Sequence, residues 1–424
     1  MKLKYYDKLD EKVYTEKLSN GLTVFVIPKP GYAKKYAFFA TNYGGADRRF
    51  KVGGEWIDTP EGVAHFLEHK MFDTKDGNAL EILSSNGASP NAYTSSDMTA
   101  YYFSCIDGFE ENLKTLLSFV SVPYFTPESV AKEQGIIGQE IRMTDDEPEY
   151  ALYFNLMKAL YEHHPLRYSV AGTVESISEI TENTLYDCHK IFYNPSNMVL
   201  CVVGDVDAET VIKIARDNLP ESPGEIPKRD YGGDEPEHAA SDSLSAAMDV
   251  GMPIFAIGYK CEKVLKGNEF LKQQLIGSLA VNCIAGPSSP LYTDLYSKAL
   301  ISSEFSADFE KVADRTHAVF SGESREPQAV SAAIKAEIEQ INKTGINGAL
   351  FDRIKKAFKG SLLRQLNSFE GICAGIASSY FNNSSYYDKT SILSEITIKD
   401  TEEFIKKNLI PEKCAISTVL PNNN

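Results

Sequence analysis

Apolar residues alternate with polar ones in several short stretches of the 424-residue chain, beginning at Leu22 to Ile27 directly after an Asn20-Gly21 turn. This period of two predicts β-strands, which we place at 22–28, 36–43, 91–95, 99–106 and 198–205 in the first half. Apolar residues three and four apart predict helices at 60–72, 78–86, 108–121, 127–144, 149–162 and 182–192. Because strands and helices do not alternate strictly, the order predicts an α+β fold, in which a mainly antiparallel sheet packs on helices.

Residues 219–246 differ from the rest in composition, because they are rich in Pro, Gly, Ser and charge and nearly free of large apolar side chains. Such a segment is typical of a linker. It predicts an N-terminal domain at 1–218 and a C-terminal domain at 247–424. The two parts resemble each other when Gly138 is set over Gly360, and each closes with an apolar strand, NMVLCVVGDVD and KCAISTVLPN. We therefore expect two homologous α/β sandwich domains.

The chain is acidic, with 43 Lys and Arg against 59 Asp and Glu and a formal net charge of −16. It is a poor candidate for binding nucleic acid or an anionic membrane. No stretch approaches the roughly 20 apolar residues that cross a bilayer, and the amino terminus lacks the apolar core of a signal peptide. The seven cysteines are scattered without a CxxC pair, which indicates buried free thiols in a reducing compartment. We expect a cytoplasmic protein.

The sequence GVAHFLEHKMF, residues 62–72, holds two histidines four positions apart. Thr59-Pro60-Glu61 suit the first turn of a helix, and in such a helix His65 and His69 lie on one face, where both imidazoles can reach one zinc ion. Glu68 lies roughly 100° around the helix from His69, where its carboxylate can take a proton from water. The chance number of His-x-x-Glu-His strings in this composition is about 0.01. A metal site is therefore favoured over two histidines that only pack or face solvent.

A catalytic zinc site usually has three protein ligands and a water, so another element must supply the third. The predicted helix 127–144 carries Glu133 and Glu140 seven positions apart, on one stripe of the helix. Two exposed glutamates would be the simplest interpretation. Three isoleucines among residues 136–141 make the helix partly buried, however, and an unpaired carboxylate there is costly. Metal coordination, or a hydrogen bond to a ligand histidine, would relieve that cost.

The motif His-x-x-Glu-His, followed 140 − 69 = 71 residues later by Glu140 with Glu133 seven positions before it, resembles the pitrilysin/insulinase family of zinc peptidases, the inverzincins. The segments LSNGLTVFVIPKP, SPNAYTSSDMTAYYFSC, YNPSNMVLCVVGDVD and PSSPLYTDLYSKAL extend the resemblance over nearly the whole chain. In length the chain is similar to the half-size members, which are related to the mitochondrial processing peptidase subunits and to short bacterial zinc proteases.

The resemblance implies one zinc ion per chain, with His65, His69 and Glu140 as ligands. Glu68 would be the general base, since zinc lowers the pKa of its water to about 7 and Glu68 would pass the proton to the leaving amine. Glu133 would assist catalysis through a hydrogen bond toward the site. The implied activity is a zinc endopeptidase that acts on short or unfolded peptides.

The family binds its peptide as a strand added to a sheet edge beside the zinc, and Asn91, Ala92, Tyr93 and Thr94 resemble that edge. Main-chain hydrogen bonds would give broad affinity, to which side-chain pockets add preference. The alternative is an inner hairpin with a turn near Ser96-Asp97, in which the aromatic side chains Tyr93, Tyr101 and Phe103 fill the core. We favour this alternative for the aromatic rings and the substrate role for the backbone of Asn91 and Ala92.

The second half lacks the metal-binding residues, because Leu362 stands at the place of Glu140 and Lys355 at that of Glu133. Family members also carry an Arg and a Tyr, seven apart, that hold the substrate and steady the oxyanion. Here Tyr296 occupies the expected arginine position, and the tyrosine position falls near Ser302. This pair is missing at its expected place.

Half-size members act as dimers of clam-shaped subunits that close a chamber around the peptide, so the resemblance implies a partner. We expect a heterodimer in which a homologous, metal-free chain supplies the Arg and Tyr. A homodimer, with Arg315 or Arg364 replacing the missing arginine, stays open.

Two other functions also stay open. One is a non-catalytic peptide-binding or assembly subunit, against which the full set of His65, Glu68, His69 and Glu140 counts. The other is a zinc hydrolase of another substrate class, against which the edge-strand match and the two-copy layout count.

Overall fold

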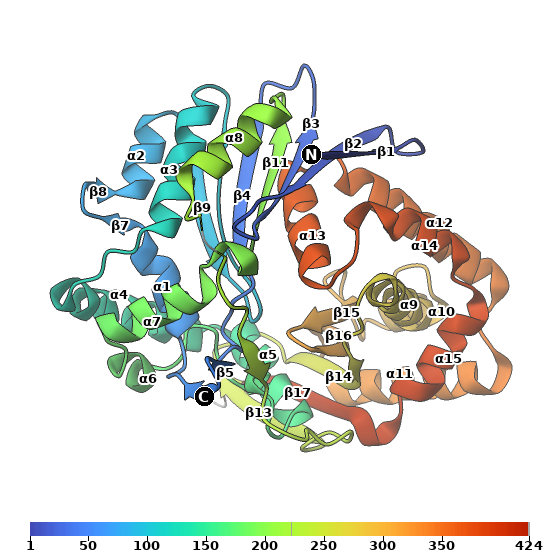
Figure 1. The fold of residues 1–424 in the computed structure, drawn as a ribbon. Helices are drawn as coiled ribbons and strands as arrows, with labels where there is room; N and C mark the ends of the chain where they lie inside the picture. The colour runs from blue at the N-terminus through green and yellow to red at the C-terminus, as the bar shows by residue number, and fades with distance from the viewer. Residues whose placement is uncertain (222, 423–424) are drawn as a thin grey trace. The chain divides into compact units, whose positions relative to one another are not determined.

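The computed structural model describes residues 1–221 and 223–422, which form two compact units (Figure 1). Unit 1 comprises Met1–Ile141, Ser169–Tyr231 and Leu363–Phe381, and unit 2 comprises Arg142–Tyr168, Gly232–Leu362 and the segment from Asn382 onward. Each unit therefore contains segments from both halves of the chain. Among the described residues, no helix is long and apolar enough to cross a membrane.

Unit 1 is built on a seven-stranded sheet with the order β1-β2-β3-β11-β4-β10-β9. Its strands are β1 (Lys2–Tyr6), β2 (Glu11–Lys17), β3 (Thr23–Pro28), β4 (Lys35–Thr41), β9 (Ser89–Thr94), β10 (Thr99–Cys105) and β11 (Met198–Gly204). All neighbours are antiparallel except β3 and β11. The five strands predicted in this half are confirmed to within two residues at either end. The alternation pattern did not predict β1 and β2.

Helices cover both faces of this sheet. One face packs on α1 (Val63–Met71), α3 (Phe109–Ser121) and α8 (Ala208–Asn218), and the other on α13 (Phe369–Phe381). The unit also contains α2 (Ala79–Ser85), most of α4 (Pro127–Asp145), α6 (Val174–Ser178) and α7 (Glu182–Phe192). The small strands are β5 (Arg49–Val52), β6 (Glu55–Asp58), β7 (Asp73–Thr74), β8 (Gly77–Asn78) and β12 (Lys228–Asp230). Of these helices, α6 and α8 were not predicted.

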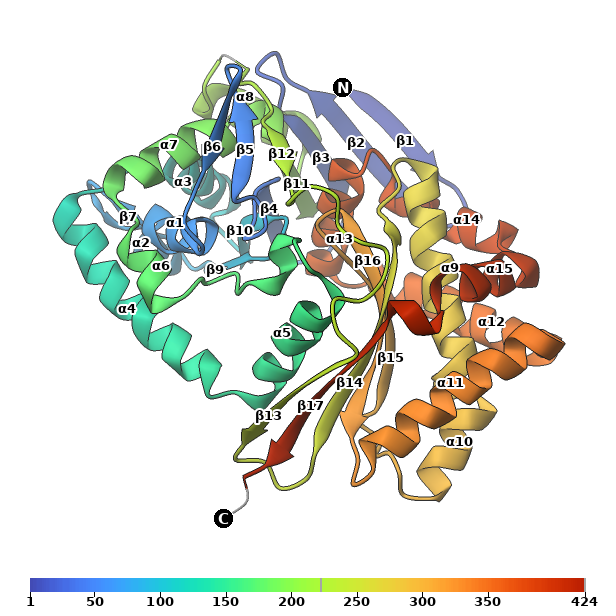
Figure 2. The same ribbon diagram turned by 90° about the horizontal axis from the view of Figure 1, so that it is seen from below.

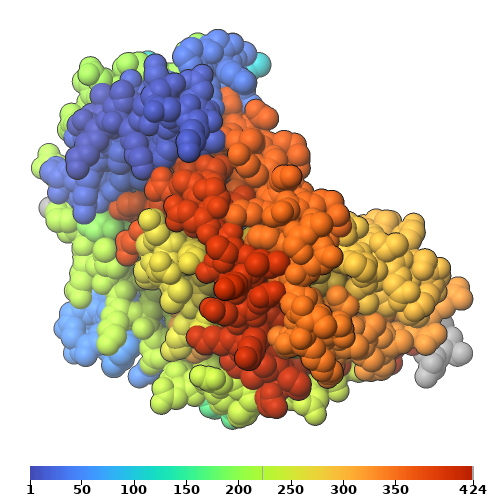
Figure 3. All heavy atoms as spheres, turned by 90° about the vertical axis from the view of Figure 1, so that its right-hand side faces the viewer, coloured from blue at the N-terminus to red at the C-terminus, as the bar shows by residue number. Residues whose placement is uncertain are grey.

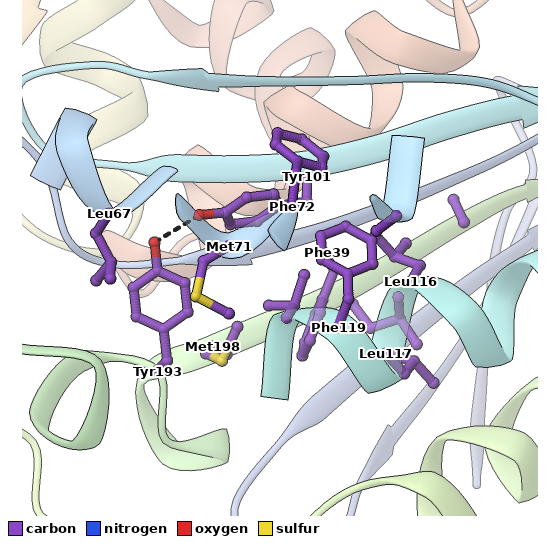
Figure 4. Packing of buried hydrophobic residues seen from close by; sticks show 14 of the residues in the cluster. Phe39, Leu67, Met71, Phe72, Tyr101, Leu116, Leu117, Phe119, Tyr193 and Met198 are labelled. Atoms are coloured by element: carbon purple, nitrogen blue, oxygen red, sulfur yellow. Dashed lines mark hydrogen bonds between the residues drawn. The ribbon is translucent and has the colours of Figure 1, made fainter. Parts of the chain in front are cut away.

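The core beneath α1 fixes that helix on the sheet (Figure 4). Leu67 and Met71 of α1 are at most 1% exposed and pack among rings of the sheet and of α3. Two buried tyrosines lie in the same cluster, and their hydroxyl groups, on Tyr101 and Tyr193, are 2.8 Å apart and hydrogen-bonded. Because the core holds the apolar face of α1, the side chains on the opposite face of the helix point in a fixed direction.

Unit 2 is built on a five-stranded sheet with the order β13-β17-β14-β16-β15. Its strands are β13 (Ser243–Met248), β14 (Ile254–Lys263), β15 (Ser306–Val312), β16 (Arg315–Glu323) and β17 (Cys414–Pro421). Figure 2 shows α5 (Pro148–Leu160) on one side and α9 (Asn268–Ala285), α11 (Pro327–Thr344) and α15 (Ile398–Asn408) on the other. The remaining helices are α10 (Pro290–Ser297), α12 (Gly348–Gln365) and α14 (Lys389–Glu395). In Figure 3 the spheres of α12, α14 and α15, orange to red, lie at the surface.

The two sheets share one topology. The order β3-β11-β4-β10-β9 in unit 1 corresponds, strand for strand along the chain, to β13-β17-β14-β16-β15 in unit 2. In both sheets the first pair is parallel and the other three pairs are antiparallel. The predicted fold class, two homologous sandwiches with mainly antiparallel sheets, is confirmed.

The units exchange one helix each. Helix α5, from the first half of the chain, packs on β13, β14 and β17, whereas α13, from the second half, packs on β4 and β11. The segment that carries α5 leaves unit 1 after Ile141, and the segment that carries α13 enters unit 1 at Leu363. These two positions coincide when Gly138 is set over Gly360. The compact units therefore do not follow the linear boundaries 1–218 and 247–424, which stay a prediction for the limits of the homologous halves.

Residues 219–246, predicted as a linker, contribute β12 and the first part of β13 and are anchored in both units. Within unit 1, Arg229 and Tyr231 bind the buried Asp47 carboxylate at 2.8 and 3.0 Å. Within unit 2, the buried Glu235 carboxylate accepts hydrogen bonds from three successive backbone amides, those of residues 162–164, and pairs with Lys260. A composition typical of a linker thus conceals a few strongly bound side chains.

Candidate metal centre

Helix α1 begins three residues later than predicted, so the prediction that Thr59-Pro60-Glu61 form its first turn is wrong. Its N-cap is Gly62, whose backbone is left-handed with φ +90°. A Cβ atom at Gly62 would lie 2.4 Å from the Ala171 carbonyl oxygen. The segment before the helix is held instead by tertiary contacts, since the Ser176 hydroxyl donates to the Glu61 carbonyl oxygen at 3.0 Å. Glycine is required because only it combines this φ with so close an approach.

The structure brings the three predicted ligands together. His65 Nε2 lies 3.5 Å from Glu140 Oε1, and His69 Nε2 lies 3.5 Å from Glu140 Oε2. One ligand atom from each of the three residues lies within 4.8 Å of the others. Atoms bound to one zinc ion at about 2.0–2.2 Å in tetrahedral directions are roughly 3.3–3.5 Å apart. The separations therefore fit a shared ion, and they exceed the usual length of direct N–H···O hydrogen bonds.

No other cluster of this kind occurs in the part of the chain that the structure describes. In the second half, Lys355 donates to the backbone oxygens of Ser394 and Ile396, and Leu362 packs against the core of unit 2. The residues at these two positions, which are equivalent to Glu133 and Glu140, therefore contribute to the packing of unit 2 and not to a metal site.

Glu133 supports the cluster from the same helix as Glu140. Its Oε1 lies 3.1 Å from His69 Nδ1, so that the two groups share a hydrogen bond. Its Oε2 lies 4.0 Å from Nζ of Lys70, a side chain only 1% exposed that also pairs with Asp73. A carboxylate on Nδ1 leaves Nε2 free to act as a ligand and fixes the ring.

Glu68 is nearly buried, with 8% of its surface exposed. Its Oε2 accepts a hydrogen bond of 2.7 Å from the hydroxyl group of Thr94. Sequence reasoning placed Thr94 on the substrate strand but did not find this contact, since it depends on the register between β9 and α1. Lys70 was also missed, although a lysine between the buried Leu67 and Met71 is a signal that could have been used.

The surroundings shift the pKa values of the site in a consistent way. Burial lowers the pKa of His65 to about 3, and His69 adds to this effect, so His65 is neutral and able to bind a cation. Burial also acts to lower the pKa of His69, but the Glu133 hydrogen bond and the nearby carboxylates outweigh it and raise that pKa. Burial raises the pKa of Glu68, partly offset by Thr94 and His69. A carboxylate with a raised pKa is suited to general-base chemistry.

Strand β9 forms one edge of the seven-stranded sheet, and α1 packs against it. The Ala92 amide is hydrogen-bonded to the Asn91 side chain at 2.8 Å. Tyr93 lies near Phe38 and Tyr102, with ring centroids 6.2 Å from each. Tyr101 and Phe103 are fully buried, as the hairpin alternative predicted, whereas Tyr93, which it also placed in the core, is only partly buried.

Comparisons with known proteins agree with this geometry. Residues 53–174 match the family model described as insulinase (peptidase family M16), and residues 179–358 match the model described as the peptidase M16 inactive domain. The chain is 39% identical over 425 residues to the Bacillus subtilis protein named uncharacterized zinc protease YmfH, covering 99% of both chains.

Solved structures give the same result. The fold is similar to an M16-like peptidase from Alicyclobacillus acidocaldarius, with a TM-score of 0.94 and 32% identity over 98% of this chain and 99% of that one. It is also similar in fold to a protease from Helicobacter pylori, with a TM-score of 0.84 and 21% identity over 97% and 100% of the two chains. By similarity along practically its whole length, the chain belongs to the insulinase family of M16 peptidases, as a half-size, single-chain member.

Proposed function

We propose that this protein is a zinc endopeptidase that hydrolyses short or unfolded peptides. The observation that carries the proposal is the nearly buried Glu68 carboxylate beside a cluster of two imidazoles and one carboxylate. Its relatives include proteins named zinc proteases. The donor set of two nitrogens and an oxygen is the kind that catalytic zinc prefers.

In this proposal His65, His69 and Glu140 hold one zinc ion, which, when bound, polarises the scissile carbonyl and makes a water more acidic. Glu68 accepts a proton from the attacking water and returns it to the leaving amine. Glu133 keeps the His69 ring oriented through Nδ1. Glu68 therefore carries the proton from the water to the leaving amine, and its raised pKa suits it both to accept and to release that proton.

The peptide would bind as a strand along the outer edge of β9, at Asn91, Ala92, Tyr93 and Thr94. Support comes from the position of β9 at the end of the sheet and against α1. The Ala92 amide, which donates to the Asn91 side chain in this structure, would instead donate to a carbonyl oxygen of the incoming strand. Main-chain pairing of this kind is independent of sequence, so we expect broad specificity.

We also propose that a second, homologous chain without metal ligands completes the enzyme and closes a chamber around the peptide. The Arg and Tyr of the family are missing at their expected place, where Tyr296 is 53% exposed and stacks on Tyr292 with ring centroids 6.0 Å apart. Arg315 is 7% exposed and lies 3.6 Å from Asp314, so it is already engaged. The chain purified alone is then expected to bind zinc but to cleave slowly, whereas full activity of a homodimer would contradict this part.

The test is the Glu68→Gln variant, purified from the native host with any partner that accompanies it, beside wild type and Glu128→Gln. We expect all three to retain the same zinc content. Only wild type and the control, which changes an exposed glutamate of α4, should digest a peptide library. Equal turnover by Glu68→Gln and wild type would end the peptidase proposal.

The second candidate is a non-catalytic peptide-binding or assembly subunit. The match of residues 179–358 to a domain described as inactive favours it. It predicts that wild type, with zinc bound and its partner present, binds peptides without cleaving them, and that Glu68→Gln binds them equally well.

A further inference from the structure

The Glu68 carboxylate depends on one neighbour for its orientation. Among the residues that the structure describes, the Thr94 hydroxyl is the only hydrogen-bond donor to it, at 2.7 Å. Glu68 is 8% exposed, so few water molecules can replace that donor. A hydrogen bond to a charged acceptor in such surroundings is short and directional.

The single proton of the Thr94 hydroxyl is available for Glu68. Thr99, paired with Thr94 across the β9–β10 hairpin, donates its own hydroxyl proton to the Tyr43 carbonyl oxygen at 2.9 Å. The two threonine hydroxyl oxygens are 3.4 Å apart, and Thr94 is the acceptor in this contact. The contact with Thr99 therefore does not use the proton that Thr94 donates to Glu68. Thr94 can therefore donate without losing another partner.

The end of β9 is held in place. The amides of Gly45 and Ala46 donate to the carbonyl oxygens of Ser95 and Ser96 at 3.0 and 2.9 Å. The Ser95 amide donates to the Met98 carbonyl oxygen at 2.8 Å, which closes the turn. The hydroxyl group that points to Glu68 thus projects from a fixed backbone.

We propose that Thr94 is a positioning residue for the general base. Its hydroxyl group fixes the direction of the Glu68 carboxylate. Because Thr94 belongs to the strand along which the peptide is proposed to lie, it holds the base at a constant place relative to the bound backbone. This inference rests on the proposed function. It gives Thr94, which was predicted only as a substrate-binding residue, a second role in orienting the general base.

The experiment compares Thr94→Val, which keeps the branched shape but removes the donor, with Thr94→Ser, which keeps the donor. We expect kcat of Thr94→Val to fall about 10- to 100-fold with KM within about threefold of wild type, because proton transfer depends on alignment. Thr94→Ser should restore kcat to within about threefold. Thr115→Val, the same exchange on α3, is the matched control.

Two further measurements are independent of turnover. Zinc content should be unchanged in all Thr94 variants. A crystal structure of Thr94→Val should show the Glu68 carboxylate rotated from the direction that it has beside Thr94. If Thr94→Val does not fold, Thr94→Ala serves as the variant without a hydroxyl group.

The inference is overturned if Thr94→Val is as fast as wild type, if Thr94→Ser is as slow as Thr94→Val, or if either loses zinc. These results leave the proposed function intact as long as wild type cleaves and Glu68→Gln does not. Equal turnover by wild type and Glu68→Gln would remove the proposed function itself, and this inference with it.

Discussion

At the scale of single residues, the metal centre is held by side chains that are not ligands. The Glu133 carboxylate lies between His69 Nδ1 and the buried Lys70 ammonium group, which in turn pairs with Asp73. The two carboxylates and the ammonium group between them alternate in sign. Each group therefore stabilises the charge of the next, most strongly at the Lys70 side chain, which is only 1% exposed.

Replacing Glu133 by Gln removes a charge but keeps the volume of the side chain. We expect zinc affinity to fall about 10- to 100-fold, since a carboxylate on the outer nitrogen orients a ligand imidazole and raises its basicity. Competition with a chromophoric chelator measures this. The control Glu128→Gln, on the exposed first turn of the same helix, should bind zinc like wild type. Unchanged affinity in Glu133→Gln would contradict the supporting role.

Helical periodicity predicted which residues share a face of each helix, and the family resemblance implied that the two pairs meet at one site. His65 and His69 share a face of α1, and Glu133 and Glu140 share a face of α4, so each helix presents its pair in one direction. The contacts of Thr94 and Lys70 were not predictable in this way. They depend on how β9 and α4 are placed against α1, which no local pattern records.

At the scale of elements, the start of α1 depends on the shape of the backbone and not on a capping side chain. No side chain caps the helix, and Gly62 adopts φ +90° against the Ala171 carbonyl group. The residue types at positions 59–61 favoured an earlier start. Tertiary contacts of residues 171–176 outweighed that local preference.

Gly62→Ala should lower the free energy of unfolding by about 2–5 kcal/mol, from a strained φ and an overpacked methyl group together. Gly87→Ala is the matched control, because Gly87 has φ +76° and no atom lies within 4 Å of the place that a methyl group would take. It should cost only about 1–2 kcal/mol. Chemical denaturation measures both, and equal losses would refute the close-approach argument.

Residues 219–246 show the limit of composition as a guide to structure. The segment is poor in apolar residues, yet the side chain of Glu235 is buried and accepts hydrogen bonds from Lys260 and three amides. One carboxylate with four donors can fix a segment that has few hydrophobic side chains to bury. Such a contact leaves no periodic signal in the sequence.

The Glu235 anchor should make stability depend on pH. Burial acts to raise the pKa of Glu235, but the Lys260 and backbone hydrogen bonds outweigh it and lower the pKa to about 2. The native state thus favours the carboxylate more than the unfolded chain does. The stabilisation is complete above the ordinary value of 4.5 and is lost as pH falls from there toward 2.

We therefore expect the melting temperature of Glu235→Gln to be lower than that of wild type at pH 7. The gap between the two should narrow as pH falls below 4.5. Glu237→Gln, whose side chain is 91% exposed, should follow the wild-type curve. A constant gap between Glu235→Gln and wild type across the acid range would exclude this assignment.

At the scale of the whole molecule, the exchange of α5 and α13 ties the two halves of the chain together. Each sheet is covered on one face by helices from its own half and on the other by a helix from the other half. The amphipathic pattern predicted that α5 would pack on a sheet, and the likeness between the two halves of the sequence predicted that they would share a fold. They could not indicate which sheet α5 would cover, since both sheets offer a similar apolar face.

Expressed alone, residues 1–218 and 247–424 should each fail to fold cooperatively, because each leaves one apolar sheet face exposed. The near-ultraviolet circular dichroism of each fragment should lack the signal of fixed aromatic rings. Co-expression of 1–246 with 247–424 should restore that signal together with zinc binding. A stable 1–218 fragment with the zinc affinity of the full chain would show that α13 is dispensable.

The exchanged helices also constrain how such a protein can arise by duplication. A polypeptide with only one copy of the repeat would have one helix that does not pack on its own sheet and one sheet face that is left uncovered. Two such molecules could exchange these helices, so that each covers the sheet of the other. The ancestral state would then be a symmetric pair of short chains, and gene fusion would have made permanent an association that already existed.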